Sequence, residues 1–384
     1  MGIVRVQGCL LVTFLACVSP SAAAESDVDR LLDLLVDKGL VSREEAAGLR
    51  ADLAIRSQEG KEKQKDFAIS AGRPVRVSGY SQDRYQSLAE QGRIDGFDVR
   101  RARLDIRGQV GPRFEYRTQL ELGGTRGPFL LDATIGYTYQ PYLKVTAGQF
   151  KVPFSQENLA SSPRLETINR AQVVEALVAR GRDVIGNHNG RDIGVQVGGT
   201  LVATGHGYLL DYAVGVLDGA GINTADGNED KDLVGRVVLH PRPDLDLGGS
   251  YYAGRGRRNP GPGNAASQPA NLDRNRIGGE FALRHDPLTV RAEYIAGTDD
   301  ATDKAGWYLQ AGYFVLPRRL QGVVKVDTYD ADTAADDNET TVYTGGVNVF
   351  FAPWAFLQVN GEAKRESGTE VGNDALAGQL TLQF

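Results

Sequence analysis

The chain has 384 residues, 47 of them glycine, with 43 Lys and Arg against 49 Asp and Glu and a formal net charge of −6 at pH 7. A net negative charge argues against a general nucleic-acid binder. Both cysteines and the single methionine lie within the first 17 residues, so the rest of the chain forms no disulfide and is held by burial and hydrogen bonds.

Residues 1–24 have the pattern of a secretory signal peptide. Arg5 lies in a short n-region, "GCLLVTFLACV" is an apolar core too short to span a membrane, and Ala22-Ala23-Ala24 fits an A-x-A cleavage site. A lipoprotein interpretation through Cys17 is weaker, because Phe14 and Leu15 precede that cysteine. We therefore expect Sec export and removal of residues 1–24.

Residues 25–66 are predicted to form a periplasmic helical or coiled-coil segment and a linker. In "SDVDRLLDLLVDKG", Val28, Leu31 and Leu35 lie on one helical face, and Ser42 with Glu45 forms a capping box for a second helix. "RSQEGKEKQKD" follows as a charged linker. The sequence leaves open whether the segment packs as a helical hairpin or self-associates as a short coil.

Residues 67–384 are predicted to form a β-barrel, because apolar positions recur every second residue from about residue 74. In "RFEYRTQLEL", Phe114 and Leu120 lie on one face, and Glu115 and Glu121 lie on the other. Sixteen such strands are predicted. They begin near residues 74, 99, 113, 129, 142, 191, 207, 232, 244, 275, 288, 306, 320, 341, 354 and 374.

The connections between these strands alternate in length. Short ones such as "VGP" and "QPY" alternate with long polar ones, the longest being residues 152–190. Short periplasmic turns and long external loops are typical of an outer-membrane barrel, and the chain ends on the aromatic Phe384. The predicted fold class is therefore all-β: a 16-stranded antiparallel transmembrane β-barrel with a short N-terminal helical segment, located in the outer membrane of a Gram-negative bacterium.

The stretch "GFDVRRARLDIRG" concentrates arginines on one predicted strand. Period two directs Arg101, Arg103 and Arg107 into a lumen that sixteen strands leave filled with water. The next strand adds Arg113 and Arg117 on its inward face. Arginine is permanently charged and matches the oxygens of phosphate or carboxylate, so this column predicts an anion pathway.

Two points in this stretch stay open in the sequence. Arg100 has the parity of the lipid face, where burial at mid-bilayer costs about 2–4 kcal/mol, so we expect it at the membrane interface or at the start of its strand. Asp105, Glu115 and Glu121 are close enough in the predicted sheet to pair with the arginines. The column is then either a selective pathway or a salt-bridged wall that lines a general pore.

The long connection 152–190 is predicted to fold inward and narrow the lumen. Lys151 and Arg170 are then expected at the constriction, facing the arginine column, with Pro153 and Pro163 stiffening the loop. The alternative is that this loop caps the mouth and never enters. The residues predicted to bind anions are thus Arg101, Arg103, Arg107, Arg113, Arg117, Lys151 and Arg170.

Catalysis has little support in the sequence. The four histidines fall in predicted loops or turns, and the chain has no HExxH and no G-x-S-x-G motif. Acidic runs in two predicted external loops lack the D-x-[DN]-x-[DN]-G pattern and are interpreted as solvated loops. We predict no enzyme activity, no metal and no cofactor.

Three motifs resemble the phosphate-selective porin O/P family: "RRARLDIRG", "GQFKVPFSQENLASS" and "GRDIGVQVGG". The resemblance implies a sixteen-stranded, usually trimeric barrel that passes anions such as phosphate or polyphosphate. It assigns the family's arginine ladder to Arg101, Arg103 and Arg107, with Lys151 in the K-V-P-F motif. The family's lysine cluster near the pore mouth has no counterpart that we can map, and Asn169 stands where the family tends to have Glu.

The predicted function is a porin that forms a water-filled diffusion channel, preferring anions or phosphate through a lumenal arginine ladder. The expected partners are small anions, outer-membrane lipid and further copies in a homotrimer, with no nucleic acid. The alternatives are a non-selective general porin and a structural barrel with a plugged lumen.

Overall fold

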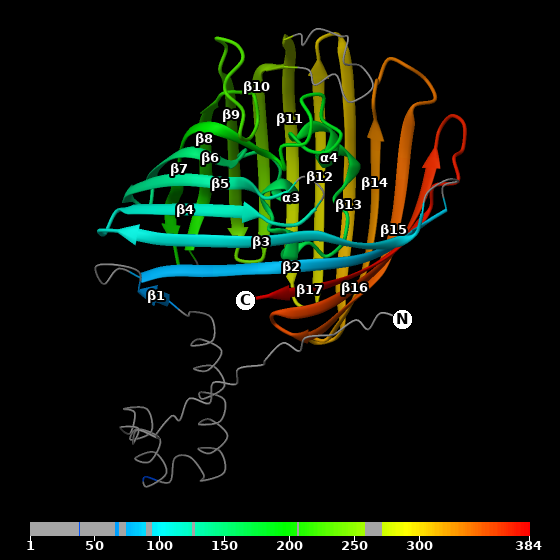
Figure 1. The fold of residues 1–384 in the computed structure, drawn as a ribbon, viewed down its shortest axis with the longest axis horizontal. Coiled ribbons are helices and arrows are strands. Elements are labelled where there is room, and N and C mark those ends of the chain that lie inside the picture. The colour runs from blue at the N-terminus through cyan, green and yellow to red at the C-terminus, as the bar shows by residue number, and fades with distance from the viewer. Residues whose placement is uncertain are drawn as a thin grey trace, which may run out of the picture. The chain divides into compact units, whose positions relative to one another are not determined.

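A computed structural model describes Lys38 and residues 66–68, 74–89, 94–124, 127–205, 207–257 and 271–384. From Asp66 onward the chain is one compact unit, a closed β-barrel (Figure 1). The predicted signal peptide and nearly all of the predicted helical segment lie outside the described residues.

Sixteen antiparallel strands close the barrel, which confirms the predicted fold class. They are β2 (Pro74–Leu88), β3 (Gly96–Val110), β4 (Phe114–Glu121), β5 (Phe129–Gln140), β6 (Leu143–Lys151), β7 (Arg191–Thr204), β8 (Gly207–Leu217), β9 (Asp232–Arg242), β10 (Leu245–Arg257), β11 (Asn271–His285), β12 (Leu288–Asp299), β13 (Thr302–Leu316), β14 (Leu320–Asp330), β15 (Glu339–Ala352), β16 (Ala355–Glu366) and β17 (Ala375–Gln383). Each strand pairs with the next, and β17 pairs with β2 to complete the ring.

Two details of the ring were not predicted. A short strand, β1 (Asp66–Ala68), pairs antiparallel with the start of β2. Strand β13 begins at Thr302 rather than near residue 306, so that only Asp300 and Ala301 connect it to β12, where a longer loop was expected. Polar residues extend the strands beyond the apolar pattern here, because the backbone ladder continues past the lipid-facing side chains.

The two-residue period separates an outer face from a lumenal face. In β13, Trp307, Leu309 and Tyr313 point outward and are about half exposed, whereas Tyr308 and Gln310 between them are buried inside the ring. A closed ring also pairs the backbone groups of every strand, which the bilayer interior requires. The outward apolar residues therefore form the lipid-facing surface.

The helices of the described residues all belong to the long connection 152–190. They are α3 (Gln156–Leu159), the 3₁₀ turn η1 (Ser162–Arg164) and α4 (Gln172–Leu177). No helix in this described part of the chain has the length and hydropathy needed to cross a bilayer.

The connection 152–190 folds into the barrel, as predicted, and does not merely cap its mouth. Gln156 Nε2 donates to two backbone carbonyls of β11 and β12 at 2.9 Å each. On β16 and β14, Asn360 Oδ1 accepts from the Ile168 amide at 2.7 Å, and Asp327 Oδ1 accepts from the Gln172 amide at 3.0 Å. Figure 1 shows α3 and α4 within the ring of strands.

Apolar side chains of this loop fill one side of the lumen. Phe154, Val174 and Leu177 pack in one cluster with Ile295 and Tyr308 of the wall, and all five are almost fully buried. Close packing of apolar groups excludes water from that side. An open cavity lies on the side of the lumen that β3, β14 and β16 line.

Candidate anion-binding cavity

A cavity of about 600 Å³ lies between the inserted loop and the barrel wall. It is nearer to the end of the barrel that carries the long connections, because Gly123 and Gly124 of the β4–β5 connection line it. Its charged lining residues are Arg100, Arg101, Arg103, Arg170, Arg180, Arg182, Lys325, Lys364, Glu121, Glu175, Asp327 and Glu362. Eight cations against four carboxylates leave an excess of four positive charges; we call this site the arginine cavity.

Arg100 reaches the cavity through a β-bulge. Gln82 pairs with Arg101 and Asp83 pairs with Val99, which leaves Arg100 as the extra residue of β3. Its Nη2 donates to Asn169 Oδ1 at 2.8 Å, and its buried Nη1 has no hydrogen-bond partner among the described residues. Arg100 was expected on the lipid-facing parity, at the membrane interface or at the start of its strand; it lines the cavity instead, because strict alternation fails at a bulge.

Arg101 and Arg103 enter the cavity from β3, as their parity predicted. Arg101 Nη1 donates to Gln82 Oε1 at 2.9 Å and forms no ion pair with a described residue. Arg103 Nε lies 2.7 Å from Glu121 Oε2, with both side chains about 7% exposed, and its guanidinium is 5.8 Å from the centre of the Tyr80 ring. The charge of Arg103 is compensated, whereas that of Arg101 is not.

The inserted loop supplies three more arginines. Arg170 Nε donates to a backbone carbonyl of α3 at 3.1 Å, Arg180 donates to Asn158 Oδ1 at 2.8 and 3.0 Å, and Arg182 donates to Gln172 Oε1 at 3.0 Å. Neutral acceptors hold these guanidiniums in place, and of the three only Arg180 lies within ion-pair distance of a described carboxylate, with its Nη1 3.9 Å from Glu175 Oε1.

Burial opposes the charge of two of these loop arginines. It lowers the pKa of Arg170, and burial together with the neighbouring charge of Arg170 lowers the pKa of Arg180. A lowered pKa in a cation means that its charged form is less favourable in the site than in water. An anion entering the cavity would reverse part of that loss.

Sequence reasoning found Arg101, Arg103 and Arg170 but missed other cations of the cavity. Arg180 and Arg182 occur in "ARGRD", within a loop whose path only long-range contacts determine. Lys325 Nζ donates to the Asn169 carbonyl at 2.8 Å and lies 3.7 Å from Asp327. Lys325 and Lys364 could have been found from the alternation of β14 and β16, which places both lysines on the lumenal face.

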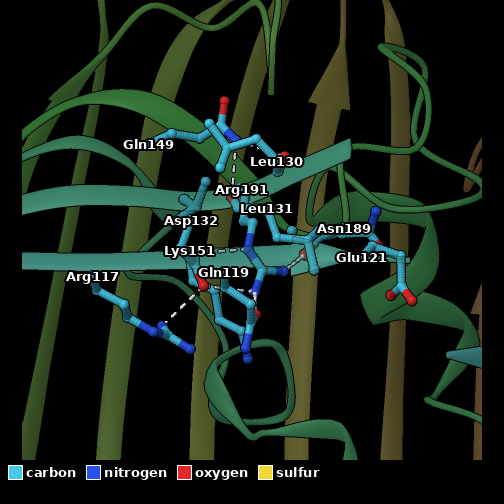
Figure 2. A network of polar contacts seen from close by, with 12 residues as sticks. Arg117, Gln119, Glu121, Leu130, Leu131, Asp132, Gln149, Lys151, Asn189 and Arg191 are labelled. Carbon is cyan, nitrogen blue, oxygen red and sulfur yellow. Dashed lines mark hydrogen bonds and ion pairs between the residues drawn. The ribbon is translucent and has the colours of Figure 1, made fainter. Parts of the chain in front are cut away.

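Nearer the opposite end of the barrel, a second group of arginines is paired with acids. Arg107 Nε lies 2.7 Å and Arg117 Nη2 2.5 Å from Asp105, and Arg117 Nη1 lies 2.9 Å from Asp132. Asp132 also accepts from the fully buried Arg191 at 2.8 Å, and Figure 2 shows it between Arg117 and Arg191. These five residues form one connected set, the paired network, in which the wall is salt-bridged.

Lys151 has a different role from the predicted one. Its Nζ donates to the carbonyl oxygens of Asn158, Leu159 and Ala160 at 2.9, 3.0 and 2.8 Å, so that all three of its protons are used. It does not line the arginine cavity. Lys151 instead ties the end of α3 to the last residue of β6 and so holds the loop inside the barrel.

The prediction that Arg113 lines the pore is wrong. Arg113 lies in the turn before β4, where its Nη1 donates to Tyr137 Oη at 3.1 Å and its guanidinium is 5.4 Å from the centre of the Tyr139 ring. Both tyrosines share the outward parity of Ile135, which is 65% exposed. The turn releases Arg113 from the alternation of β4 and lets it join an aromatic rim on the outer face.

Residues 78–384 match the family described as phosphate-selective porin O and P. This chain belongs to that family. The porin is thus an outer-membrane channel of Gram-negative bacteria and not an enzyme. Its long connections lie outside the cell and its short turns in the periplasm, which puts the arginine cavity toward the extracellular side and the paired network toward the periplasm.

Solved structures with the same fold include other outer-membrane proteins. The porin is 14% identical to an anion-selective porin from Comamonas acidovorans, with a TM-score of 0.61 over 81% of this chain and all of that chain. OmpT of Vibrio cholerae, in a trimer form, is 12% identical with a TM-score of 0.60, over 81% and 99% of the two chains. The outer-membrane channel DcaP of Acinetobacter baumannii is 13% identical with a TM-score of 0.58, over 84% and 100%.

These identities show a shared fold only. No curated protein has significant sequence similarity to the porin.

Proposed function

We propose that the porin conducts anions in preference to cations, and that the arginine cavity is the site that selects phosphate and similar oxyanions. The observation that carries the proposal is the excess of four positive charges around an open cavity of about 600 Å³. Arg100 and Arg101 line this cavity and form no ion pair with a described carboxylate, so their charges are available to an anion.

The chemistry follows from the residue type. A guanidinium presents a planar fork of donors that matches the oxygens of a phosphate, and it remains charged at any physiological pH. Cations grouped in a confined space raise the local concentration of anions and exclude other cations. Because several arginines surround the cavity, an anion exchanges one pair of donors for the next without being held strongly by any of them.

The proposed site includes fewer of the predicted arginines than the ladder that the sequence predicted. Arg101, Arg103 and Arg170 line the cavity, while Arg107 and Arg117 belong to the paired network and contribute little net charge. The paired network then serves as a polar, nearly neutral wall past which a selected ion moves. We also propose a homotrimer, which the trimer form of the similarly folded OmpT supports.

Reversal potentials in planar bilayers under a potassium chloride gradient test the proposal directly. We expect the sign that corresponds to chloride permeating faster than potassium, and a block of the chloride current by inorganic phosphate. A reversal potential at zero, or one of the opposite sign, would support the general-porin alternative and overturn the anion preference. No measurable conductance from correctly folded porin would support the plugged barrel.

A further inference from the structure

The arginine cavity contains more than an anion site requires. Besides the cations, four carboxylates and the side-chain amides of Asn169, Gln172, Asn187 and Asn189 line it. Carboxylates repel a bare phosphate or chloride ion, so their presence calls for a ligand that has groups other than oxyanion oxygens. The volume of about 600 Å³ also falls in the range of about 300–1,000 Å³ that is typical of sites for organic ligands.

The carboxylates differ in what they already bind. Glu121 is occupied by Arg103 and two backbone amides, and Asp327 accepts from the Gln172 amide. Glu175 accepts from the Gly181 amide and lies 3.9 Å from Arg180 Nη1. Glu362 on β16 accepts from Asn169 Nδ2 at 2.7 Å through Oε1 only, and its Oε2 has no partner among the described residues. Glu362 thus lines the cavity with one carboxylate oxygen that accepts no hydrogen bond from a described residue.

The surrounding charge identifies the kind of donor. Lys364 is the next residue on the same lumenal face of β16, at a spacing of roughly 7 Å, and Lys325 Nζ lies 3.7 Å from Asp327. An ammonium group beside these lysines would be repelled. A hydroxyl donates a hydrogen bond without adding positive charge, and the side-chain amides can donate to its oxygen or accept from it.

We propose that the cavity takes a hydroxylated organic phosphate, of the chemical class of a sugar phosphate. The arginines of β3 and of the inserted loop receive the phosphate, and Glu362 together with the amides receives the hydroxyl groups. This inference rests on the proposed anion preference of the channel and adds the class of permeant ligand to it.

Block of the chloride current in planar bilayers tests the inference with the purified porin. Glucose 6-phosphate is expected to block at about one tenth of the concentration that inorganic phosphate needs, since it adds a hydrogen bond to a charged acceptor. Glucose should not block at these concentrations. Phosphoethanolamine, which carries an ammonium instead of hydroxyls, should block less well than glycerol 1-phosphate.

Two variants test whether Glu362 is the residue that gives glucose 6-phosphate its advantage over inorganic phosphate. Glu362→Gln removes the carboxylate but keeps an acceptor for Asn169, so glucose 6-phosphate should lose its advantage while phosphate, relieved of one repulsive charge, blocks at a lower concentration. Lys364→Gln is the matched control on the same face: it should weaken both blockers equally and preserve their ratio. A structural defect in Glu362→Gln would not weaken block by glucose 6-phosphate relative to phosphate while strengthening block by phosphate. The comparison of the blockers in the wild-type porin does not depend on the folding of any variant.

Equal block by phosphate and glucose 6-phosphate in a channel that is still anion-selective would overturn this inference and leave the proposed function intact. Block by glucose alone, or stronger block by phosphoethanolamine than by glycerol 1-phosphate, would overturn it as well. A wild-type channel without anion selectivity would instead overturn the proposed function itself.

Discussion

Two arginine-rich regions of the lumen share strand β3 and differ in the acids around them. At its extracellular end, Arg100 and Arg101 donate to neutral acceptors, pair with no described carboxylate, and lie in a cavity with an excess of four positive charges. Toward the periplasm, Arg107 lies 2.7 Å from Asp105, which also binds Arg117. Arginines of one strand thus create a positive electrostatic field at its extracellular end and form part of a nearly neutral wall toward the periplasm.

The comparison teaches that the number of arginines does not measure the selectivity of a pore. A guanidinium paired at 2.7–2.9 Å with a carboxylate presents little field to a passing ion, and its main effect is to hold the wall together. A guanidinium held by an amide or a backbone carbonyl keeps its field. Substitutions in the paired network are therefore expected to lower the stability of the barrel, and substitutions in the arginine cavity are expected to lower its anion selectivity.

Asp132→Ala should have the largest effect, and on stability. The change leaves Arg117 and the fully buried Arg191 without their shared carboxylate, and breaking a buried pair costs about 3–5 kcal/mol. Urea unfolding followed by heat-modifiable gel mobility measures the loss. Asp226→Ala, in an exposed loop pair with Lys231, is the control and should change stability by about 0–1 kcal/mol. Equal effects of the two substitutions would contradict the paired network.

The double variant Arg100→Ala/Arg101→Ala should have the largest effect on selectivity. A unit charge acting at about 4 Å is worth about 1 kcal/mol in water, so removing two should lower the anion-to-cation permeability ratio by about 30-fold. Reversal potentials measure the ratio. Arg107→Ala, from the same strand but paired with Asp105, is the matched control and should leave the ratio nearly unchanged. A larger change from Arg107→Ala would place the selectivity in the paired network instead.

Asn169→Glu should have a smaller effect of the same kind. Asn169 Oδ1 accepts from Arg100, and a carboxylate at this position would pair with that guanidinium and remove one excess charge. The permeability ratio should fall by about fivefold. Asn169→Gln keeps a neutral acceptor and serves as control. Should the two variants have the same reversal potential, the charge of Arg100 has no part in selection.

Arg113→Ala should have the smallest effect. Its guanidinium lies against Tyr137 and Tyr139 on the outer face, away from the conducting space. We expect no change in the permeability ratio and a change in stability within about 0.5 kcal/mol. The same bilayer and unfolding measurements apply. A reduced anion preference would return Arg113 to the pore lining that its position in the sequence suggested.

The sequence determined the barrel because its signals are local. The two-residue period, the Pro-containing short turns and the alternation of loop lengths each depend on a few adjacent residues, and sixteen strands were found with starts within four residues of those observed. The inserted loop was also expected, since a connection as long as 152–190 has few other places to go. Arg101, Arg103 and Arg170 were placed in the lumen for the same reasons.

The site depended on contacts that the sequence does not display. One bulged residue turns Arg100 from the lipid side into the cavity, and one turn moves Arg113 out of the lumen. Lys151 has the residue type of an anion ligand, but the fold surrounds it with three carbonyl oxygens. Whether an arginine is paired or unpaired is set by acids on other strands and by the inserted loop. Local patterns therefore fixed which residues face the water, and only the tertiary structure decided which of their charges remain uncompensated.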